Sequence, residues 1–238
     1  MKLDLLVFAA HPDDAELGCG GTIIKHVQAG KKTGIIDLTR GELGTRGNAE
    51  LRTKESAAAS KVLGITVREN LGFADGFFRN DEEHQLAIVK MIRKYRPEII
   101  LCNAVSDRHP DHARAAALVP EANFYSGLNK VNTVISGKAQ ICWRARAVYH
   151  YIQDRYIRPD FAIDITPVIE RKMKAIHAYK SQFYSELSEE PVTPISTKEF
   201  IDALFARATE YGRPIGVRYA EGFTVERIAG VESLFDLK

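Results

Sequence analysis

The sequence predicts an α/β fold: a doubly wound, mostly parallel, Rossmann-like sheet flanked by helices, with an irregular C-terminal third. Short apolar runs alternate with segments whose apolar residues recur at helical spacing as far as Tyr125. This alternation is typical of parallel strands joined by right-handed helical crossovers. After Ser126 this alternation of strand-like and helix-like segments becomes less regular. The 238 residues suit one large domain, so we expect a single domain over 1–238.

The first strand and helix open the chain. Leu3 to Ala10 is a run dominated by apolar residues, as in a parallel strand buried on both faces. Gly20 to Ala29 has helical spacing and stops at Gly30, a common C-terminal signal. Thr33 to Leu38 is the second expected strand.

The same pattern then repeats. Asn48 is a suitable N-cap for a helix that runs to Leu63 and ends at Gly64. Val67 to Leu71 is an expected short strand. Glu82 to Tyr95 is helical in period, and Pro97 prevents the helix from continuing.

Glu98 to Cys102 is the fourth expected strand, and Pro110 to Tyr125 a helix with proline in its first turn. Ser181 to Ser196 is polar and long for a connection, so it could form a lid or an oligomer contact. The elements expected in the C-terminal third are strands at Val148–Ile152 and Phe161–Ile165 and helices at Pro167–Tyr179 and Lys198–Tyr211.

Composition excludes several classes of protein. The formal charge is +2, from 33 basic and 31 acidic residues, without a dense basic stretch, so we expect no nucleic-acid partner. No window approaches the ~20 apolar residues that cross a bilayer. Three irregularly spaced cysteines argue against a disulfide framework and for a reducing compartment. We therefore expect a cytoplasmic protein without a membrane partner.

Two polar clusters directly follow predicted strands. The sequence His-Pro-Asp-Asp-Ala-Glu occupies 11–16, and Asp-Arg-His-Pro-Asp-His occupies 107–112. In doubly wound sheets, ligands bind in the loops at the carboxyl ends of the strands. We therefore expect both clusters at one site.

Their residue types suit a metal ion. Zinc is bound by imidazole nitrogen and carboxylate oxygen, and catalytic sites use three protein ligands and leave one position open. His11 and Asp14 are three residues apart across a tight turn, so they can share one ion. His109 and His112 are also three apart at a helix start, so one can complete the set while the other faces substrate. Spacing alone does not say which.

Asp13 is a candidate general base. A carboxylate beside a metal-bound water, but not itself a ligand, can take the proton of that water and pass it to a leaving amine. Asp111 could orient the imidazole of His109, which would then stabilise a developing oxyanion.

The two clusters resemble those of the PIG-L-type (LmbE-like) zinc deacetylases, which act on N-acetylglucosamine conjugates. The resemblance extends over nearly the whole chain. Further segments are similar to the branch that deacetylates N-acetylglucosaminyl-malate in bacillithiol biosynthesis. These segments are Glu50–Arg52, Asn70–Leu71 ahead of Asp75, Tyr179–Phe183 and Tyr219–Phe223.

The resemblance implies a role for each residue of the two clusters. The implied zinc ligands are His11, Asp14 and His112; the implied catalytic residues are Asp13 as general base and His109, paired with Asp111, as electrostatic stabiliser. The activity implied is that of a zinc-dependent N-deacetylase in which a zinc-bound water attacks the acetyl carbonyl.

The resemblance also implies substrate contacts. Arg52 would face malate carboxylates or sugar hydroxyls, and Asp75 would accept hydrogen bonds from the sugar. We place Arg108 among the substrate contacts, with a solvated surface position as the alternative. The expected ion is Zn²⁺, although a His, His, Asp set also accepts Fe²⁺. Relatives often form hexamers, so a homo-oligomer is implied.

One position departs from the family. Some relatives place a tyrosine hydroxyl near the oxyanion, and an approximate alignment puts Phe200 there. A phenylalanine donates no hydrogen bond, so another group such as Tyr184, or His109 alone, would have to serve.

Other interpretations are weaker. Gly18, Gly20 and Gly21 suggest dinucleotide binding, but Ile23 stands where that fingerprint needs a third glycine. We expect these glycines to let the loop return beneath the metal. The alternative functions are deacetylation of another small N-acetyl sugar, such as a chitobiose-like sugar, or of a thiol conjugate, and an inactive metal-binding protein. Asp13 argues against the last, because a site that only holds a metal needs no spare carboxylate.

Overall fold

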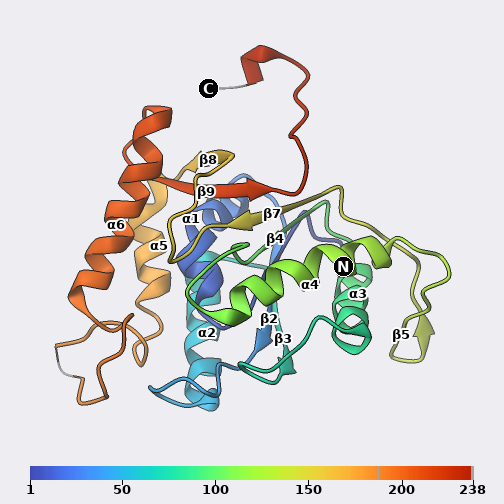
Figure 1. Cartoon of the computed structure of the whole chain (residues 1–238), viewed down its shortest axis with the longest axis horizontal. Helices are drawn as coiled ribbons and strands as arrows, with labels where there is room; N and C mark the ends of the chain where they lie inside the picture. Colours follow the sequence, from blue (N-terminus) through green and yellow to red (C-terminus); the bar gives the residue numbers. More distant parts are fainter. Residues whose placement is uncertain (187, 237–238) are drawn as a thin grey trace.

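The computed structural model of the chain describes residues 1–186 and 188–236 and is built around one mixed sheet (Figure 1). In this described part, seven strands pair in the order β3-β2-β1-β4-β7-β9-β8. These are β1 (Leu5–Ala9), β2 (Thr33–Thr39), β3 (Val67–Phe73), β4 (Ile99–Cys102), β7 (Ala147–Tyr151), β8 (Phe161–Asp164) and β9 (Ala220–Val225). The helices are α1 (Asp14–Gln28), α2 (Ala49–Leu63), α3 (Glu82–Tyr95), α4 (Pro110–Ser126), α5 (Ile169–Ile176) and α6 (Lys198–Gly212). The predicted doubly wound, mostly parallel fold is confirmed.

The register of the parallel strands brings the two polar clusters together. β1 pairs with β2 on one side and β4 on the other, and Leu5 lies opposite both Thr33 and Ile99. The carboxyl ends of β1 and β4 therefore reach the same edge of the sheet, where their loops are neighbours.

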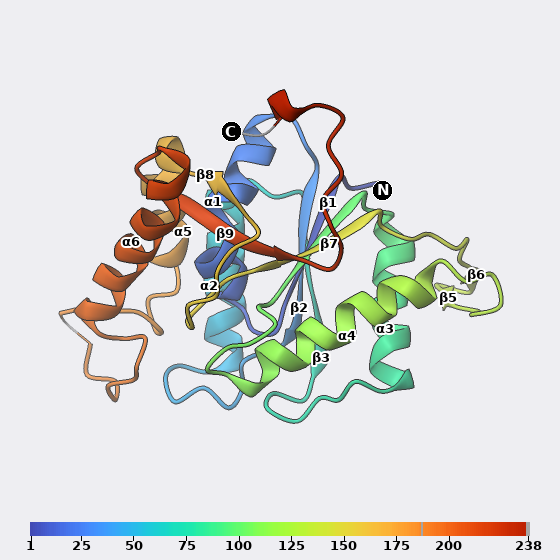
Figure 2. The same cartoon turned by 45° about the horizontal axis from the view of Figure 1, so that its top comes forward.

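Helices cover both faces of the sheet (Figure 2), with α3 and α4 on one side and α1, α2 and α5 on the other. Leu6 and Phe8 of β1 belong to the core beneath α3 and α4, whereas Val7 and Ala9 belong to the core beneath α1 and α2. Burial on both faces explains why β1 has a continuous apolar run rather than an alternating pattern.

Capping residues and a proline set the ends of the helices that connect the parallel strands. The Asn48 side chain accepts the backbone N–H of Leu51 and caps α2, and Gly64 ends that helix at φ +78°. Pro110 occupies the first turn of α4, where its missing N–H is not needed. The predictions for α2, α3 and α4 are confirmed to within a residue or two.

The prediction for the first helix was wrong at its start. α1 begins at Asp14 rather than Gly20, and a kink at Cys19 divides it. Gly18 and Gly21 therefore lie inside the helix and not in a loop beneath a metal. A Cβ at Gly18 would overlap the ring of Tyr151, and one at Gly21 would lie 2.6 Å from Ile165 Cγ2. These glycines allow α1 to pack closely on its neighbours.

The kink also explains why a dinucleotide interpretation does not hold. The backbone N–H groups of Gly21 and Thr22 point at the Glu221 carboxylate, at 2.8 and 2.7 Å. Lys172 Nζ is 2.7 Å from the same carboxylate. The N–H groups after the kink, which a pyrophosphate would need, are thus occupied by an acidic side chain of the chain itself.

The C-terminal third contains elements that the sequence did not predict. β9 inserts antiparallel between β7 and β8, and a separate antiparallel hairpin pairs β5 (Val134–Ile135) with β6 (Lys138–Ala139). The helix expected at Pro167–Tyr179 is shorter: a 3-10 turn, Thr166–Val168, precedes α5. After β9 the chain leaves the sheet toward the C-terminus (Figure 1). Over the described ranges, none of the helices has the length and apolar character needed to span a bilayer.

Candidate metal centre and active site

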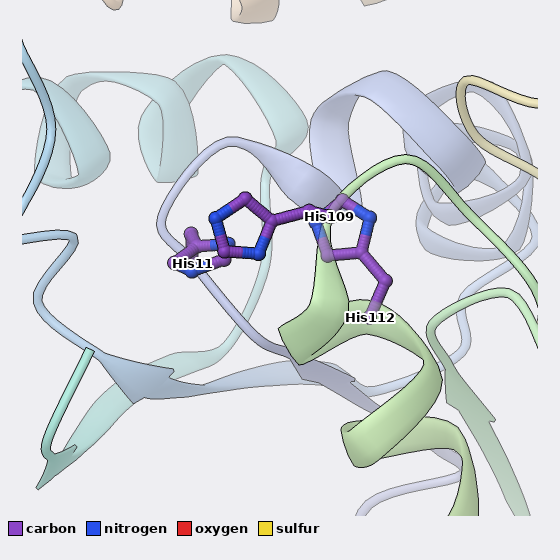
Figure 3. Close-up of side chains that lie close together, drawn as sticks. All are labelled: His11, His109 and His112. Atoms are coloured by element: carbon purple, nitrogen blue, oxygen red, sulfur yellow. The ribbon is translucent and has the colours of Figure 1, made fainter. Parts of the chain in front are cut away.

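Three imidazole rings meet at the carboxyl end of the parallel strands (Figure 3). His11 comes from the loop after β1, and His109 and His112 from the start of α4. The centroid of the His11 ring lies 4.5 Å from that of His109 and 5.6 Å from that of His112. One nitrogen from each ring lies within 4.8 Å of the others. The two clusters therefore form one site.

The Asp14 carboxylate bridges two of these rings. Its Oδ2 is 3.4 Å from His11 Nδ1, and its Oδ1 is 3.2 Å from His112 Nε2. In a tetrahedral zinc site with bonds of about 2.0–2.1 Å, ligand atoms lie about 3.3 Å apart. Asp14 thus lies at a suitable spacing from His11 through one oxygen and from His112 through the other. Among the described residues, the groups whose donor atoms all lie within 4.8 Å of one another are His11, His109 and His112, and His11, Asp75 and Asp111.

His112 is oriented as metal-binding histidines usually are. Its Nδ1 is 2.8 Å from Asp107 Oδ2, which leaves Nε2 directed at Asp14. A carboxylate on the far ring nitrogen fixes the tautomer and raises the basicity of the free nitrogen. This contact favours His112, rather than His109, as the third ligand.

His109 has a different environment. The backbone N–H of Asp111 donates to His109 Nδ1 at 3.2 Å, so the neutral ring carries its proton on Nε2. Burial lowers the pKa of His109, and the neighbouring His11 and His112 lower it further. His109 is therefore a neutral ring with one N–H donor available for a ligand.

The site attracts positive charge. Burial alone would lower the pKa of His112, but Asp14 and Asp107 outweigh it and raise the value to about 9. The pKa of His11 is likewise raised, because Asp111, Asp14 and Asp75 outweigh its burial. Carboxylates that retain protons on two histidines would equally favour a cation in place of those protons.

Asp13 borders the same cavity as the three histidines, but its carboxylate is not one of the predicted metal ligands. It is the N-cap residue of α1, but its side chain does not cap the helix, and its φ is +111°. Such a conformation is costly for a non-glycine residue, on the order of 1–3 kcal/mol. Burial raises the pKa of Asp13 to about 7, although Arg52 opposes the rise. Arg52 Nη2 is 2.5 Å from Asp13 Oδ2 and 2.8 Å from Pro12 O.

The predicted substrate residues line the same cavity. Its volume is about 300 Å³, and Arg52, Asp75 and Arg108 border it together with the three histidines. Asp75 Oδ1 is 3.0 Å from His11 Nε2, and its Oδ2 accepts the backbone N–H of Leu43. The Arg108 side chain is 47% exposed and pairs with Asp154 at 3.3 Å.

Asp111 differs from the expectation. We expected its carboxylate on the His109 ring, but the carboxylate contacts Arg114 Nη1, the Gly76 N–H at 2.8 Å and His11 Nε2 at 3.4 Å. The reason is that His109 caps α4 and Asp111 follows within its first turn. The backbone of Asp111 therefore faces His109 while its side chain turns toward the loop that contains Gly76.

Sequence reasoning missed four residues of the site. These are Asn103 and Gln153, which contact Asp14; Asp107, which contacts His112; and Arg207, which borders the cavity. Two of them had a signal, because Asn103 follows β4 directly and Asp107 begins the second cluster. Gln153 and Arg207 lie in the irregular third, where the pattern gave no guide.

Phe200 borders the cavity from α6 and stacks on Phe183, with centroids 6.1 Å apart. It therefore provides a ring but no hydroxyl. Tyr184 is 39% exposed and is not among the described residues that border the cavity. Thr193 and Ile195, from the long connection expected to be a lid or an oligomer contact, form part of the cavity wall.

Comparison with known proteins agrees with this geometry. The profile of the PIG-L family (GlcNAc-PI de-N-acetylase) matches residues 6–123. The diacetylchitobiose deacetylase of Thermococcus kodakarensis is 32% identical over 232 residues, covering 92% of this chain and 81% of that protein. A probable N-acetyl-alpha-D-glucosaminyl L-malate deacetylase 2 of Bacillus anthracis is 26% identical over 201 residues, covering 78% and 84%.

Among solved structures, the conserved protein TT1542 of Thermus thermophilus has a TM-score of 0.85. It is 37% identical, and the match covers 97% of this chain and 98% of that one. The fold, the meeting of the two clusters and the extent of these similarities lead to one conclusion: the chain belongs to the PIG-L family.

Proposed function

We propose that this protein is a metal-dependent amide hydrolase that removes the acetyl group from an N-acetylglucosamine conjugate. The observation that carries the proposal is that the adjacent carboxylates of Asp13 and Asp14 have different environments. Asp14 bridges His11 and His112, whereas Asp13 lies beside them with a pKa near 7. A general base works best when its pKa lies near the working pH.

The chain supplies the proton transfers of the reaction. When bound between His11, Asp14 and His112, a divalent ion would polarise the acetyl carbonyl and acidify the attacking water. Asp13 takes a proton from that water as its oxygen bonds to the carbonyl carbon. Asp13 then returns the proton to the nitrogen as the C–N bond breaks, which releases acetate and a free amine.

His109 and Arg52 support these steps. The N–H on Nε2 of His109 is the donor available for the developing oxyanion, a role in which one donor contributes about 10²–10³ in kcat. Arg52 holds the Asp13 carboxylate in place and lowers its pKa, which keeps part of it ionised near neutral pH. Because Phe200 provides no hydroxyl, His109 carries the oxyanion role without a tyrosine from that position.

For the substrate, we propose N-acetylglucosaminyl-malate, as in bacillithiol biosynthesis. Two arginines, Arg108 and Arg207, border the cavity beside Asp154, and guanidinium groups suit the carboxylates of a malate. Asp75 would accept hydrogen bonds from the sugar. The second candidate is a chitobiose-like sugar, which the 32% identity to a diacetylchitobiose deacetylase favours.

The remaining parts of the proposal concern the ion and the assembly. We propose Zn²⁺ as the ion, with Fe²⁺ as the alternative that the same donors accept. We further propose a cytoplasmic homo-oligomer, with a hexamer as the first state to test by light scattering.

The test is acetate release from N-acetylglucosaminyl-malate, diacetylchitobiose and free N-acetylglucosamine, each with Zn²⁺ and with chelator. We expect Zn²⁺-dependent release, fastest with the malate conjugate. Fastest release from diacetylchitobiose would replace the malate assignment with the second candidate. No release from any of the three by the Zn²⁺-loaded protein would overturn the proposed hydrolase.

A further inference from the structure

The Asp14 carboxylate receives N–H groups from three separate parts of the described chain. The backbone N–H of His11 donates to Oδ2 at 2.9 Å, and Asn103 Nδ2 donates to the same oxygen at 3.0 Å. Gln153 Nε2 donates to Oδ1 at 2.9 Å. Asn103 follows β4 and Gln153 follows β7, so tertiary structure alone brings both amides to Asp14.

The two amides can adopt only one orientation. The backbone N–H of Ala10 donates to Asn103 Oδ1 at 2.9 Å, so that atom is the acceptor and Nδ2 faces Asp14. The second hydrogen of Nδ2 goes to Gln153 Oε1 at 2.8 Å, which turns Gln153 Nε2 toward Asp14. Asp14, Asn103 and Gln153 therefore close a hydrogen-bonded ring in which each amide flip is fixed by a neighbour.

Asn103 is itself held in place. His150 Nδ1 lies 2.8 Å from its backbone carbonyl, and both Asn103 and Gln153 are buried. A buried amide whose donors and acceptor are all engaged cannot rotate without leaving a polar group unpaired, at a cost of about 1–3 kcal/mol.

These contacts leave one acceptor position on Asp14 among the described residues. Oδ2 accepts two N–H groups at 2.9 and 3.0 Å and lies 3.4 Å from His11 Nδ1, whereas Oδ1 accepts one N–H group and faces His112 Nε2 at 3.2 Å. An ion shared with His112 would therefore meet Oδ1. Being neutral, the amides neither repel the carboxylate nor offer an anionic oxygen that competes for the ion.

We infer that Asn103 and Gln153 are positioning residues that hold Asp14 so that it presents Oδ1 alone to the metal ion. The inference rests on the proposed metal-dependent function. It assigns a role in ion retention to two buried amides, of which Gln153 also borders the cavity.

The test is the Zn²⁺ dissociation constant of the full chain, measured by competition with a chromophoric chelator. N103D keeps the size of the side chain and an acceptor for Ala10, but replaces the N–H that faces Asp14 with an oxygen. Q153E makes the same change toward Oδ1. We expect each variant to bind Zn²⁺ at least about tenfold more weakly, the lower end of the range for partners of metal ligands.

Asn123 provides a matched control. It is also buried, its Oδ1 accepts the Ala145 N–H, and its Nδ2 donates to the Ala145 carbonyl. It lies about 16 Å along α4 from His112. N123D should destabilise the fold, seen as a lower Tm, while its Zn²⁺ affinity stays within about twofold of the unsubstituted protein.

Two outcomes would overturn the inference: unchanged Zn²⁺ affinity in both N103D and Q153E, or equal weakening in N123D. If N103D does not fold, Q153E tests the same role, because Gln153 lies in a loop after β7. A positioning role also predicts that saturating Zn²⁺ restores most of kcat in Q153E with KM unchanged, whereas a raised KM would make Gln153 a substrate contact instead. Because Zn²⁺ binding needs no substrate, this result stands apart from any failure of acetate release.

Discussion

The loop after β1 and the first turn of α4 each contain a pair of like residues, but the two loops distinguish their pairs by different means. In the loop after β1, the two aspartates differ in pKa. Burial raises the pKa of Asp13 to about 7 against the opposing charge of Arg52, whereas burial is outweighed at Asp14 by His112 and His11, which lower its pKa. Asp13 faces the Arg52 guanidinium, whereas Asp14 accepts N–H groups from the backbone of His11 and from two amides. One carboxylate is thus free to exchange a proton, and the other is fixed in its ionised form.

In the first turn of α4, His109 and His112 differ in the direction of the hydrogen bond at Nδ1. His112 Nδ1 faces the Asp107 carboxylate, so its Nε2 is left as a lone-pair donor. His109 Nδ1 accepts a backbone N–H, so its Nε2 carries the proton. Two identical side chains, three residues apart, therefore differ in the way that their proposed roles require: one would bind a cation and the other would stabilise an anion.

The largest effect should separate the two aspartates. D13N removes the proposed general base but keeps a residue that tolerates a positive φ, so we expect kcat to fall at least about 100-fold while Zn²⁺ content is unchanged. The matched variant D14N should lose Zn²⁺. Metal analysis and acetate release on both variants check this, and near-normal turnover by D13N would exclude Asp13 as the base.

The next effect should separate the two histidines. We expect H112A to lose most of its Zn²⁺, and H109A to retain Zn²⁺ while kcat falls about 100-fold, the scale of one oxyanion donor. Equilibrium dialysis followed by metal analysis would measure the first effect and saturation kinetics the second. If H109A loses the metal and H112A keeps it, the two roles are exchanged.

A smaller effect is expected from the partner of His112. D107N removes the carboxylate from His112 Nδ1 without changing its shape, so Zn²⁺ should bind about 10-fold more weakly. The variant N123D, whose side chain bonds Ala145 and not His112, provides the comparison. Equal Zn²⁺ dissociation constants for D107N and the unsubstituted protein would show that orientation by Asp107 contributes nothing.

The smallest expected effect is a shift in pH dependence. The general base must be ionised to act, and the positive charge of Arg52 lowers the pKa of Asp13, which burial has raised to about 7. R52Q removes that charge, so the pKa of Asp13 rises and activity is lost at a higher pH than before. The acid limb of kcat/KM should move up by about one unit or more, while R52K, which keeps the charge, should leave it in place. A limb that moves down in R52Q would contradict the proposed contact.

Local signals in the sequence predicted the parallel half well. Asn48 and Gly64 bracket α2, and the apolar run of β1 identifies a strand buried on both faces. β9 was missed because Ala220–Val225 is short, contains Gly222 and pairs antiparallel with strands distant in the chain. The start of α1 was missed because its first turn is acidic and is followed by glycines, a composition that resembles a loop.

The sequence by itself determined the fold class and placed two clusters of candidate metal ligands after two strands, because periodicity and spacing are local properties of the chain. Only the tertiary structure decided which member of each pair has which environment. That choice depends on Arg52 of α2, on Asn103 and Asp107 of the loop after β4, and on Gln153 after β7, which are three separate segments. A hydrogen bond or ion pair acts over about 3 Å, so the contacts of Arg52, Asn103 and Gln153 exist only once the sheet brings those segments to one edge.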